Sequence, residues 1–471
     1  MENIGWLSIL PPVIAIILAI WTKQVFFSLF FGIWFGWTIL SGWNPFVGIA
    51  AALEACVRVF QDSGNTKVIA FSAMVGALIA YTHYSGGVEG FVQWLSRKGF
   101  ANNRRKAGLM AMLIGMVIFV ESSITCLVTG AISRPIFDRL KISREKLAYI
   151  CDSTSAPVCI LIPLNGWGAY IIGLLDNQGV EQPFAVLLKS LPVNLYAICA
   201  LITLFVVVVS GRDLGPMAAA EKRAREQGKV LRDGAVPAIS TEIISIQPKA
   251  GITPRASNMF IPIGLMVVMM PIGLFITGEG NMMNGSGSTS VFWAVSTAIA
   301  GGAVVYMLQG IFNLKQAIDY FFKGFGGLMP LALLMMLAFT IGDTCKALGT
   351  GPYIAQLTQH WISPKFVPFL LFFVSGFIAF STGTSWGTFA IMIPIGLPMV
   401  ELMGANLYIT VGAILSGGIF GDHCSPISDT TIISSIASAS DHIDHVRTQL
   451  PYALLAGFAA ALMYLAIGLA S

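Results

Sequence analysis

Carboxylates and a histidine stand inside an otherwise apolar region near the C-terminal end of the chain. The sequence from Gly421 to Thr431 reads GDHCSPISDTT and contains Asp422, His423 and Asp429. An isolated charge is costly in a lipid bilayer, so such residues normally face a cavity and serve ions or protons. Partly buried carboxylates exchange cations for protons, and histidine titrates near neutral pH. The stretch therefore predicts an ion or proton site, with a solvent-exposed loop between two short spans as the alternative.

A similar stretch begins at Asp152 and ends at Pro157. Proline removes a helix hydrogen bond and disfavours helical geometry in the residue before it, which frees backbone carbonyls. Carbonyls, hydroxyls and a carboxylate together make an oxygen cage that suits sodium. In the two stretches, the hydroxyl oxygens close to these carboxylates belong to Ser153, Thr154, Ser425 and Thr430. The alternative for Asp152 is an ordinary helix N-cap.

Two apolar regions, 107–133 and 366–400, carry polar residues at their centres. Basic residues flank 107–133 on both sides, so both of its ends belong in the cytoplasm. A segment that enters and leaves on one side is a re-entrant hairpin, whose non-helical tip must be buried in protein or line a watery cavity. The tip residues that would line this cavity are Glu121, Ser122, Ser123, Thr382, Thr384 and Ser385. A salt-bridged structural role for Glu121, and close helix packing for the hydroxyls, are the alternatives.

Four further positions are weaker candidates. Asn165 and Trp167 could face the same cavity, although tryptophan also packs in cores. Asp343 is either part of a site or the end of a span. His442 and His445 lie close to Arg447 and are expected in a solvated cytoplasmic turn. A zinc site from Asp422, His423 and Cys424 with these two histidines matches no standard ligand spacing.

The composition places the chain among multi-span membrane proteins. It has 471 residues, of which 56% are hydrophobic and 11% charged, against about 25% charged residues in soluble domains. The net charge of +4 is too small to argue for a nucleic-acid partner. Seven scattered cysteines form no CxxC pair, and no Walker A, GxSxG or HExxH sequence is present. We therefore expect neither an enzyme nor a cofactor.

Apolar stretches divide the chain into two halves of similar plan. Candidate spans lie near 6–22, 25–41, 67–83, 146–176, 184–209, 258–277, 289–308, 328–345, 408–441 and 451–470. A polar segment, 211–257, separates repeat 1–210 from repeat 258–471, and its excess of basic residues places it in the cytoplasm. Each repeat has about five spans and one hairpin. This odd number of crossings predicts an all-α polytopic membrane protein with two inverted repeats and interrupted helices meeting at the midplane, as in secondary transporters.

Three long motifs resemble the NhaC-type sodium/proton antiporter family. They are ISREKLAYICDSTSAPVCILIP (142–163), STGTSWGTFAIMIP (381–394) and the stretch from GDHCSPISDTTIISS to DHIDHVRTQLPYAL (421–454). The resemblance implies a secondary carrier coupled to sodium and protons, with hairpins and broken helices. Its motifs point to Asp152, Ser153, Thr154, Thr382, Thr384, Ser385, Asp422, His423, Ser425, Asp429 and Thr430.

The chain departs from the family pattern at the first hairpin tip. Many members look like DDY where this chain has Glu121-Ser122-Ser123, and Asn165-Gly166 replaces a Ser-Ser or Ser-Thr pair. The family is thought to include carriers of amino acids, malate and lactate. Two hypotheses follow: sodium/proton exchange, or sodium-coupled transport of a small amino acid or carboxylate. Both imply sodium, protons and the lipid bilayer as partners, in the inner (cytoplasmic) membrane, and the resemblance adds a homodimer.

Overall fold

Apolar helices make up nearly all of the regular structure in the computed structural model. It describes residues 4–22, 24–96, 102–119, 121–237, 249, 251–350, 353 and 363–470. Within these ranges the only strand-like pairing is one antiparallel bridge between Pro237 and Asp441. Eight helices of the described part are long and apolar enough to cross a membrane. The predicted all-α polytopic membrane fold is therefore confirmed.

The helices before the linker are η1 (Gly5–Ile9), α1 (Leu10–Thr22), α2 (Val25–Leu40), α3 (Pro45–Arg58), η2 (Val59–Gln61), α4 (Ser63–Tyr84), α5 (Gly87–Ser96), α6 (Arg104–Val117), α7 (Ser122–Arg139), α8 (Arg144–Ser153), α9 (Ala156–Cys159), α10 (Gly166–Asn177), α11 (Pro183–Ser190), η3 (Leu191–Val193) and α12 (Leu195–Ser210). The linker contains α13 (Gly215–Gln227). After it come α14 (Ser257–Thr277), η4 (Met282–Asn284), α15 (Gly287–Leu308), α16 (Leu314–Gly327), α17 (Met329–Leu348), η5 (Pro364–Phe366), α19 (Val367–Thr382), α20 (Ser385–Met403), α21 (Leu407–Cys424), α22 (Asp429–Ser438) and α23 (His442–Ala470).

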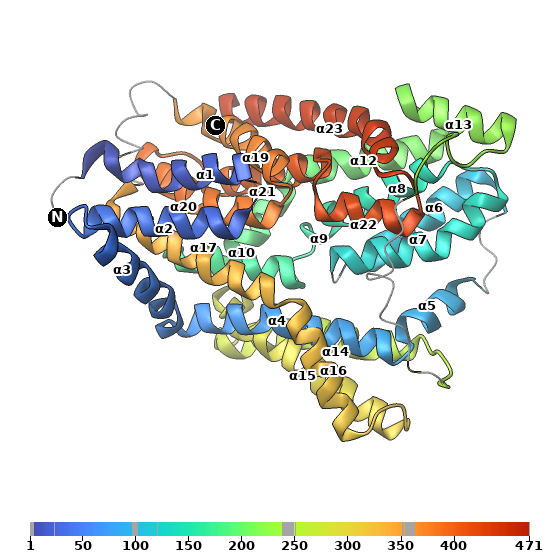
Figure 1. Cartoon of the computed structure of the whole chain (residues 1–471), viewed down its shortest axis with the longest axis horizontal. Helices are drawn as coiled ribbons and strands as arrows, with labels where there is room; N and C mark the ends of the chain where they lie inside the picture. Colours follow the sequence, from blue (N-terminus) through green and yellow to red (C-terminus); the bar gives the residue numbers. More distant parts are fainter. Residues whose placement is uncertain are drawn as a thin grey trace.

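Figure 1 shows α4, α14, α15 and α16 together along the lower side of the view, with α3 and α5 near the two ends of this group and most other helices above it. Small residues allow α4 and α16 to cross closely. A Cβ atom on Gly76 would lie 2.1 Å from the carbonyl oxygen of Gly324. Tyr81 adds a hydrogen bond of 2.9 Å from its hydroxyl to the carbonyl of Ala317. Small residues at such crossings are a common way to pack membrane helices.

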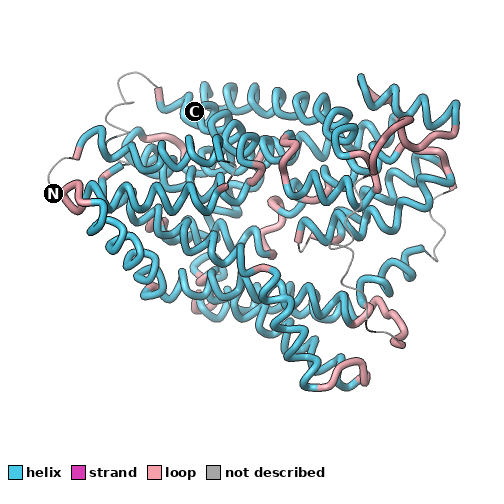
Figure 2. The backbone as a smooth tube through the Cα atoms, in the orientation of Figure 1, coloured by secondary structure: helices cyan, strands magenta, loops and turns pink. Residues whose placement is uncertain are grey.

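Breaks interrupt the helices inside the bundle as well as at its ends, as the loop segments of Figure 2 show. Each half contains a pair of helices joined by a short turn, α6 with α7 and α19 with α20, followed by a helix broken near an aspartate. The equivalent breaks separate α8 from α9 and α21 from α22. Both α19 and α20 are among the helices long enough to span. Re-entry and inversion of the repeats therefore remain predictions.

Two span predictions were wrong in their boundaries. The stretch 184–209 is two helices, because Pro192 and Asn194 end the first one and leave a turn before Leu195. The last helix begins at His442 rather than near residue 451. It begins there because the Asp441 carboxylate caps it, accepting hydrogen bonds from the backbone N–H of Ile443 and Asp444.

The linker is partly helical and is bound to both halves, to the second half through the ion pair of Arg232 with Asp444. Glu221 on α13 accepts a hydrogen bond of 2.8 Å from the backbone N–H of Ser143, the N-cap of α8, and also pairs with Arg104. Lys146 forms an ion pair of 2.9 Å with Asp213. These contacts bind the linker to the N-terminal ends of α6 and α8.

Candidate functional site

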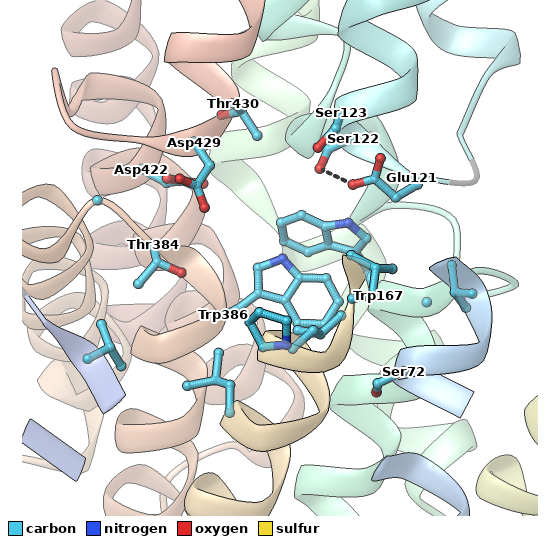
Figure 3. Close-up of a pocket in the computed structure, with 18 of the residues that line it drawn as sticks. Ser72, Glu121, Ser122, Ser123, Trp167, Thr384, Trp386, Asp422, Asp429 and Thr430 are labelled. Atoms are coloured by element: carbon cyan, nitrogen blue, oxygen red, sulfur yellow. Dashed lines mark hydrogen bonds between the residues drawn. The ribbon is translucent and has the colours of Figure 1, made fainter. Parts of the chain in front are cut away.

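Both hairpin tips line one cavity of about 590 Å³. Figure 3 shows Glu121, Ser122 and Ser123 on one side of it, and Thr384 with Asp422 and Asp429 on the other. Its polar and aromatic lining consists of Gln24, Phe26, Phe71, Ser72, Glu121, Ser122, Ser123, Trp167, Thr382, Thr384, Trp386, Asp422, Asp429 and Thr430. Three of these side chains are carboxylates, and none of the described residues that line the cavity is basic. The lining favours a cation.

The first tip is the turn between α6 and α7. Helix α6 ends at Val117, and Ile118 leaves helical geometry. Thr125 donates to the carbonyls of both Ile118 and Glu121, which satisfies backbone acceptors exposed by the break. Ser122 donates a hydrogen bond of 3.3 Å to the Glu121 carboxylate. The carboxylate is thus held at the cavity wall.

Asn165 supports this tip instead of lining the cavity as predicted. Its side-chain N–H groups donate to the carbonyls of Phe119 (2.8 Å) and Cys159 (2.9 Å). Its oxygen accepts from the backbone N–H of Trp167 and Gly168, which caps α10. All of its hydrogen-bonding capacity is directed at the protein, and it is 3% exposed. In this segment, Gly166 and Trp167 line the cavity.

The second tip is the turn between α19 and α20. Gly383 has φ 69°, and a Cβ atom there would lie 2.6 Å from the carbonyl oxygen of Ile427. Only glycine combines this backbone with such a close approach. Thr384 caps α20 through a hydrogen bond from Gly387 N–H. Thr382 and Thr384 line the cavity, whereas Ser385 lies behind them and donates a hydrogen bond of 3.1 Å to Asp422.

The break between α21 and α22 brings two carboxylates to the cavity wall. Asp422 is 4% exposed, near the end of α21. Asp429 is exposed to the cavity as the first residue of α22. A helix N-terminus favours negative charge. Ser425 lies outside the lining and closes the break by donating to the carbonyl of Phe380 (2.7 Å).

Asp152 lies at the other break but outside the cavity, fully buried. Its Oδ2 accepts hydrogen bonds from Thr431 (3.0 Å) and Gln449 (2.6 Å). Its Oδ1 has no hydrogen-bond partner among the described residues. Ser153 Oγ lies 3.2 Å from His423 Nε2. The two breaks are therefore in direct contact, although Ser153, Thr154 and His423 do not reach the cavity.

Sequence reasoning missed residues that surround Asp152. Gln449 donates to Asp152 and also to the carbonyl of His423 (2.7 Å). The hydroxyl of Tyr196 lies 2.7 Å from His423 Nδ1. His445 is fully buried, 4.0 Å from Asp152, so its placement in a solvated turn was wrong. The available signal was the four-residue spacing of His445 and Gln449, which puts both on one helix face once α23 extends back to His442.

Asp343 does not belong to this site. It is exposed near the end of α17, where its carboxylate is 3.5 Å from the side-chain nitrogen of Asn177. Of its two predicted interpretations, the structure favours the span end.

Comparison with known proteins now adds to this geometry. Residues 158–469 match the model of the Na+/H+ antiporter family. The chain belongs to this family. A Haemophilus influenzae protein of unassigned function is 32% identical over 98% of this chain and 90% of its own length.

Two relatives have named solutes. The arginine/ornithine antiporter of Halobacterium salinarum is 29% identical over 46% of this chain and 42% of its own. The malate-2H(+)/Na(+)-lactate antiporter of Bacillus subtilis is 34% identical over 35% of this chain and 36% of its own. The chain matches less than half the length of each.

The fold resembles that of the YdaH transporter of Alcanivorax borkumensis, with TM-score 0.62 and 14% identity, covering 90% of this chain and 89% of that one. The fold is that of a multi-pass membrane protein, and family membership indicates secondary active, ion-coupled transport.

Proposed function

We propose that this protein exchanges sodium for protons across the membrane. The observation that carries the proposal is the central cavity, whose charged lining consists of Glu121, Asp422 and Asp429 without a basic residue among its described lining. Hard cations prefer carboxylate, carbonyl and hydroxyl oxygens. Sodium would bind at Asp422 and Asp429, with Thr430 supplying a hydroxyl.

Asp152 would carry the proton. Its carboxylate is fully buried, and its Oδ1 has no hydrogen-bond partner among the described residues, which leaves this oxygen available to hold a proton. Asp152 also contacts α22 through Thr431, the helix that begins with Asp429. Movement of α22 during sodium binding would therefore change the surroundings of the proton carrier. This contact is a physical route for coupling.

A sodium pulse applied to proteoliposomes with a preset pH gradient tests the exchange. The gradient should collapse without any organic solute, and Asp422→Asn should slow the collapse at least tenfold. The exposed linker variant Glu226→Gln is the matched control and should behave as wild type. A wild-type protein that leaves the gradient unchanged would refute sodium/proton exchange.

Sodium-coupled transport of an organic solute is the second candidate. Its support is the cavity volume together with the pair of Trp167 and Trp386, whose ring centroids are 4.7 Å apart. The indole N–H of Trp167 has no hydrogen-bond partner among the described residues. Two relatives are named as amino-acid or carboxylate antiporters. A solute that raises the melting temperature only with sodium present would favour this function; a flat screen would count against it.

We further propose that the protein resides in the inner (cytoplasmic) membrane with linker 211–257 in the cytoplasm, from the basic excess of that segment. The homodimer implied by family resemblance remains a prediction, and crosslinking in membranes would test it.

A further inference from the structure

Two histidines at the start of α23 meet at one serine of α22. His445 is fully buried, and its Nδ1 lies 2.8 Å from Ser435 Oγ. His442 is half-buried, and its Nδ1 lies 3.0 Å from the same oxygen. On its other side, His445 Nε2 lies 2.9 Å from Gln449 Oε1 and 4.0 Å from Asp152 Oδ2. A chain of polar atoms therefore runs from a half-buried histidine to the buried carboxylate.

The hydrogen-bond partners of the two Nε2 atoms, on His442 and His445, determine which ring nitrogens carry a proton. Gln449 must direct its amide N–H groups at Asp152 and at the carbonyl of His423, since the flipped amide would face two acceptors with its oxygen. Its oxygen then faces His445, so His445 Nε2 carries a proton. His442 Nε2 lies 2.6 Å from the carbonyl of Pro426, which only accepts, so this nitrogen carries a proton too.

The Nδ1 atoms of the two histidines leave a place for one more proton. Both Nδ1 atoms face Ser435 Oγ, and a hydroxyl has a single proton to donate. It can satisfy one imidazole. The other is satisfied only when its Nδ1 is itself protonated and donates to Ser435. The pair of His442 and His445 thus accommodates one proton beyond those of two neutral imidazoles.

We propose that His442, Ser435 and His445 form a proton relay from the linker-facing end of the molecule to Asp152. The proposal rests on the proposed function, in which Asp152 carries the exchanged proton. In the relay, His442 Nδ1 gives its proton to Ser435 Oγ, and Ser435 gives its own to His445 Nδ1. His445 Nε2 then gives its proton to Asp152 Oδ2. One proton moves, Ser435 is restored, and His445 changes tautomer.

The last transfer requires a small movement. A proton donor and acceptor must approach to about 2.6–3.2 Å, whereas His445 Nε2 and Asp152 Oδ2 are 4.0 Å apart with Gln449 bonded to both side chains. Displacement of the Gln449 amide would let the two atoms meet. Gln449 is therefore a positioning residue that keeps His445 and Asp152 apart, and so prevents the last transfer, until α22 and α23 shift.

The charges near the relay distinguish its two ends. At the entrance, Asp444 pairs with Arg232 of the linker at 2.8 Å, and Arg144 donates to the carbonyl of Ala439. Asp441 is held by backbone N–H groups: although burial opposes ionisation, hydrogen bonds from Val236, Asp444 and Ile443 lower its pKa.

At the inner end of the relay stand Asp152, His423 and the thiol of Cys126, whose sulfur accepts a hydrogen bond from Ser434.

Ser435→Ala tests the relay, with Ser438→Ala as its matched control. Ser438 is a buried serine on the same helix that bonds only to carbonyls of α22. In proteoliposomes, Ser435→Ala should slow sodium-driven proton flux at least tenfold and leave sodium/sodium exchange within twofold of wild type. Unchanged proton flux, or equal loss of both activities, would overturn the relay.

A second measurement decides the relay even if the protein does not exchange sodium for protons. Histidine ¹⁵N NMR of the detergent-solubilised protein should show His442 and His445 titrating as a coupled pair. His442→Gln should change the protonation of His445, Ser435→Ala should uncouple the pair, and His83→Gln on α4 should do neither. Independent titration in the wild type would refute the relay, whereas failed exchange with a coupled pair would refute only the proposed function.

Discussion

The carboxylates of this protein differ most in what surrounds them. Asp422 and Asp429 line a cavity, while Asp152 is enclosed by α22 and α23 and bonded to Thr431 and Gln449. The first environment suits an ion that enters and leaves. The second suits a proton, which needs no volume of its own. The proposed division of labour between the carboxylates rests on this difference.

Asp152→Asn should separate the two ions. The amide has the shape of a protonated carboxyl group and cannot release a proton, so sodium-driven proton flux should fall at least tenfold. Sodium should still raise the melting temperature of the purified variant, because the cavity carboxylates remain. Loss of this sodium-dependent stabilisation would place the sodium site at Asp152 instead.

Ser385→Ala should weaken sodium binding without abolishing it. Its hydrogen bond to Asp422 holds the carboxylate at the cavity wall, and bonds to charged groups contribute about 1.5–3 kcal/mol. The sodium concentration for half-maximal transport should therefore rise about tenfold or more. Thr388→Val is the control, since the Thr388 hydroxyl bonds only to the backbone carbonyl of Thr384, the N-cap of its own helix. Equal effects in both variants would contradict a specific role for Ser385.

Residue types identified the polar groups but not their contacts. The aspartates could be found because charge is rare in apolar segments. Tyr196 could not, because a tyrosine is not unusual in a membrane helix and its partner His423 is far away in sequence. Gln449 could be linked to His445 by their four-residue spacing, but only once the start of α23 was known. Asn165 was misplaced because a side chain that caps a helix and one that faces a cavity look alike in sequence.

At the scale of elements, the helix breaks were predictable because glycine and proline mark them. The turn at Gly383 and the break after Asp152 lie where the sequence predicts them. Helix starts set by side-chain caps were harder to locate. The beginning of α23 depends on Asp441 as a cap, and a polar first turn followed by an apolar run resembles a loop followed by a span.

Gly383→Ala should damage the second tip. A non-glycine residue with left-handed backbone costs about 1–2 kcal/mol, and the added Cβ would lie 2.6 Å from the carbonyl of Ile427. The tip and the α21–α22 break must then separate, so sodium-dependent transport should fall at least fivefold and the melting temperature should drop. Gly264→Ala on α14 is the control, because nothing lies within 4 Å of its added Cβ. Wild-type behaviour of Gly383→Ala would show that the tip tolerates this separation.

At the scale of the whole molecule, the two halves share an order of elements: hairpin, broken helix and a later long helix. The two hairpins meet at the cavity with their tips, one from each side in Figure 3. An inverted repeat explains this meeting, since hairpins entering from the same face would lie side by side instead of tip to tip. The odd number of crossings predicted the inversion, but the sequence alone could not place both tips at one cavity.

Opposite membrane sidedness of the two hairpins is the decisive prediction of this architecture. Single cysteines would replace Asn102 before α6, Asp233 in the linker, and Lys365 and Glu401 at the open end of the second hairpin, all of which are exposed. A membrane-impermeant maleimide should label positions 102 and 233 from one side of oriented vesicles. Positions 365 and 401 should react only from the other side. The unsubstituted chain measures the background of its native cysteines, all but Cys199 of which are buried. Labelling of all four positions from one side would refute the inverted repeats.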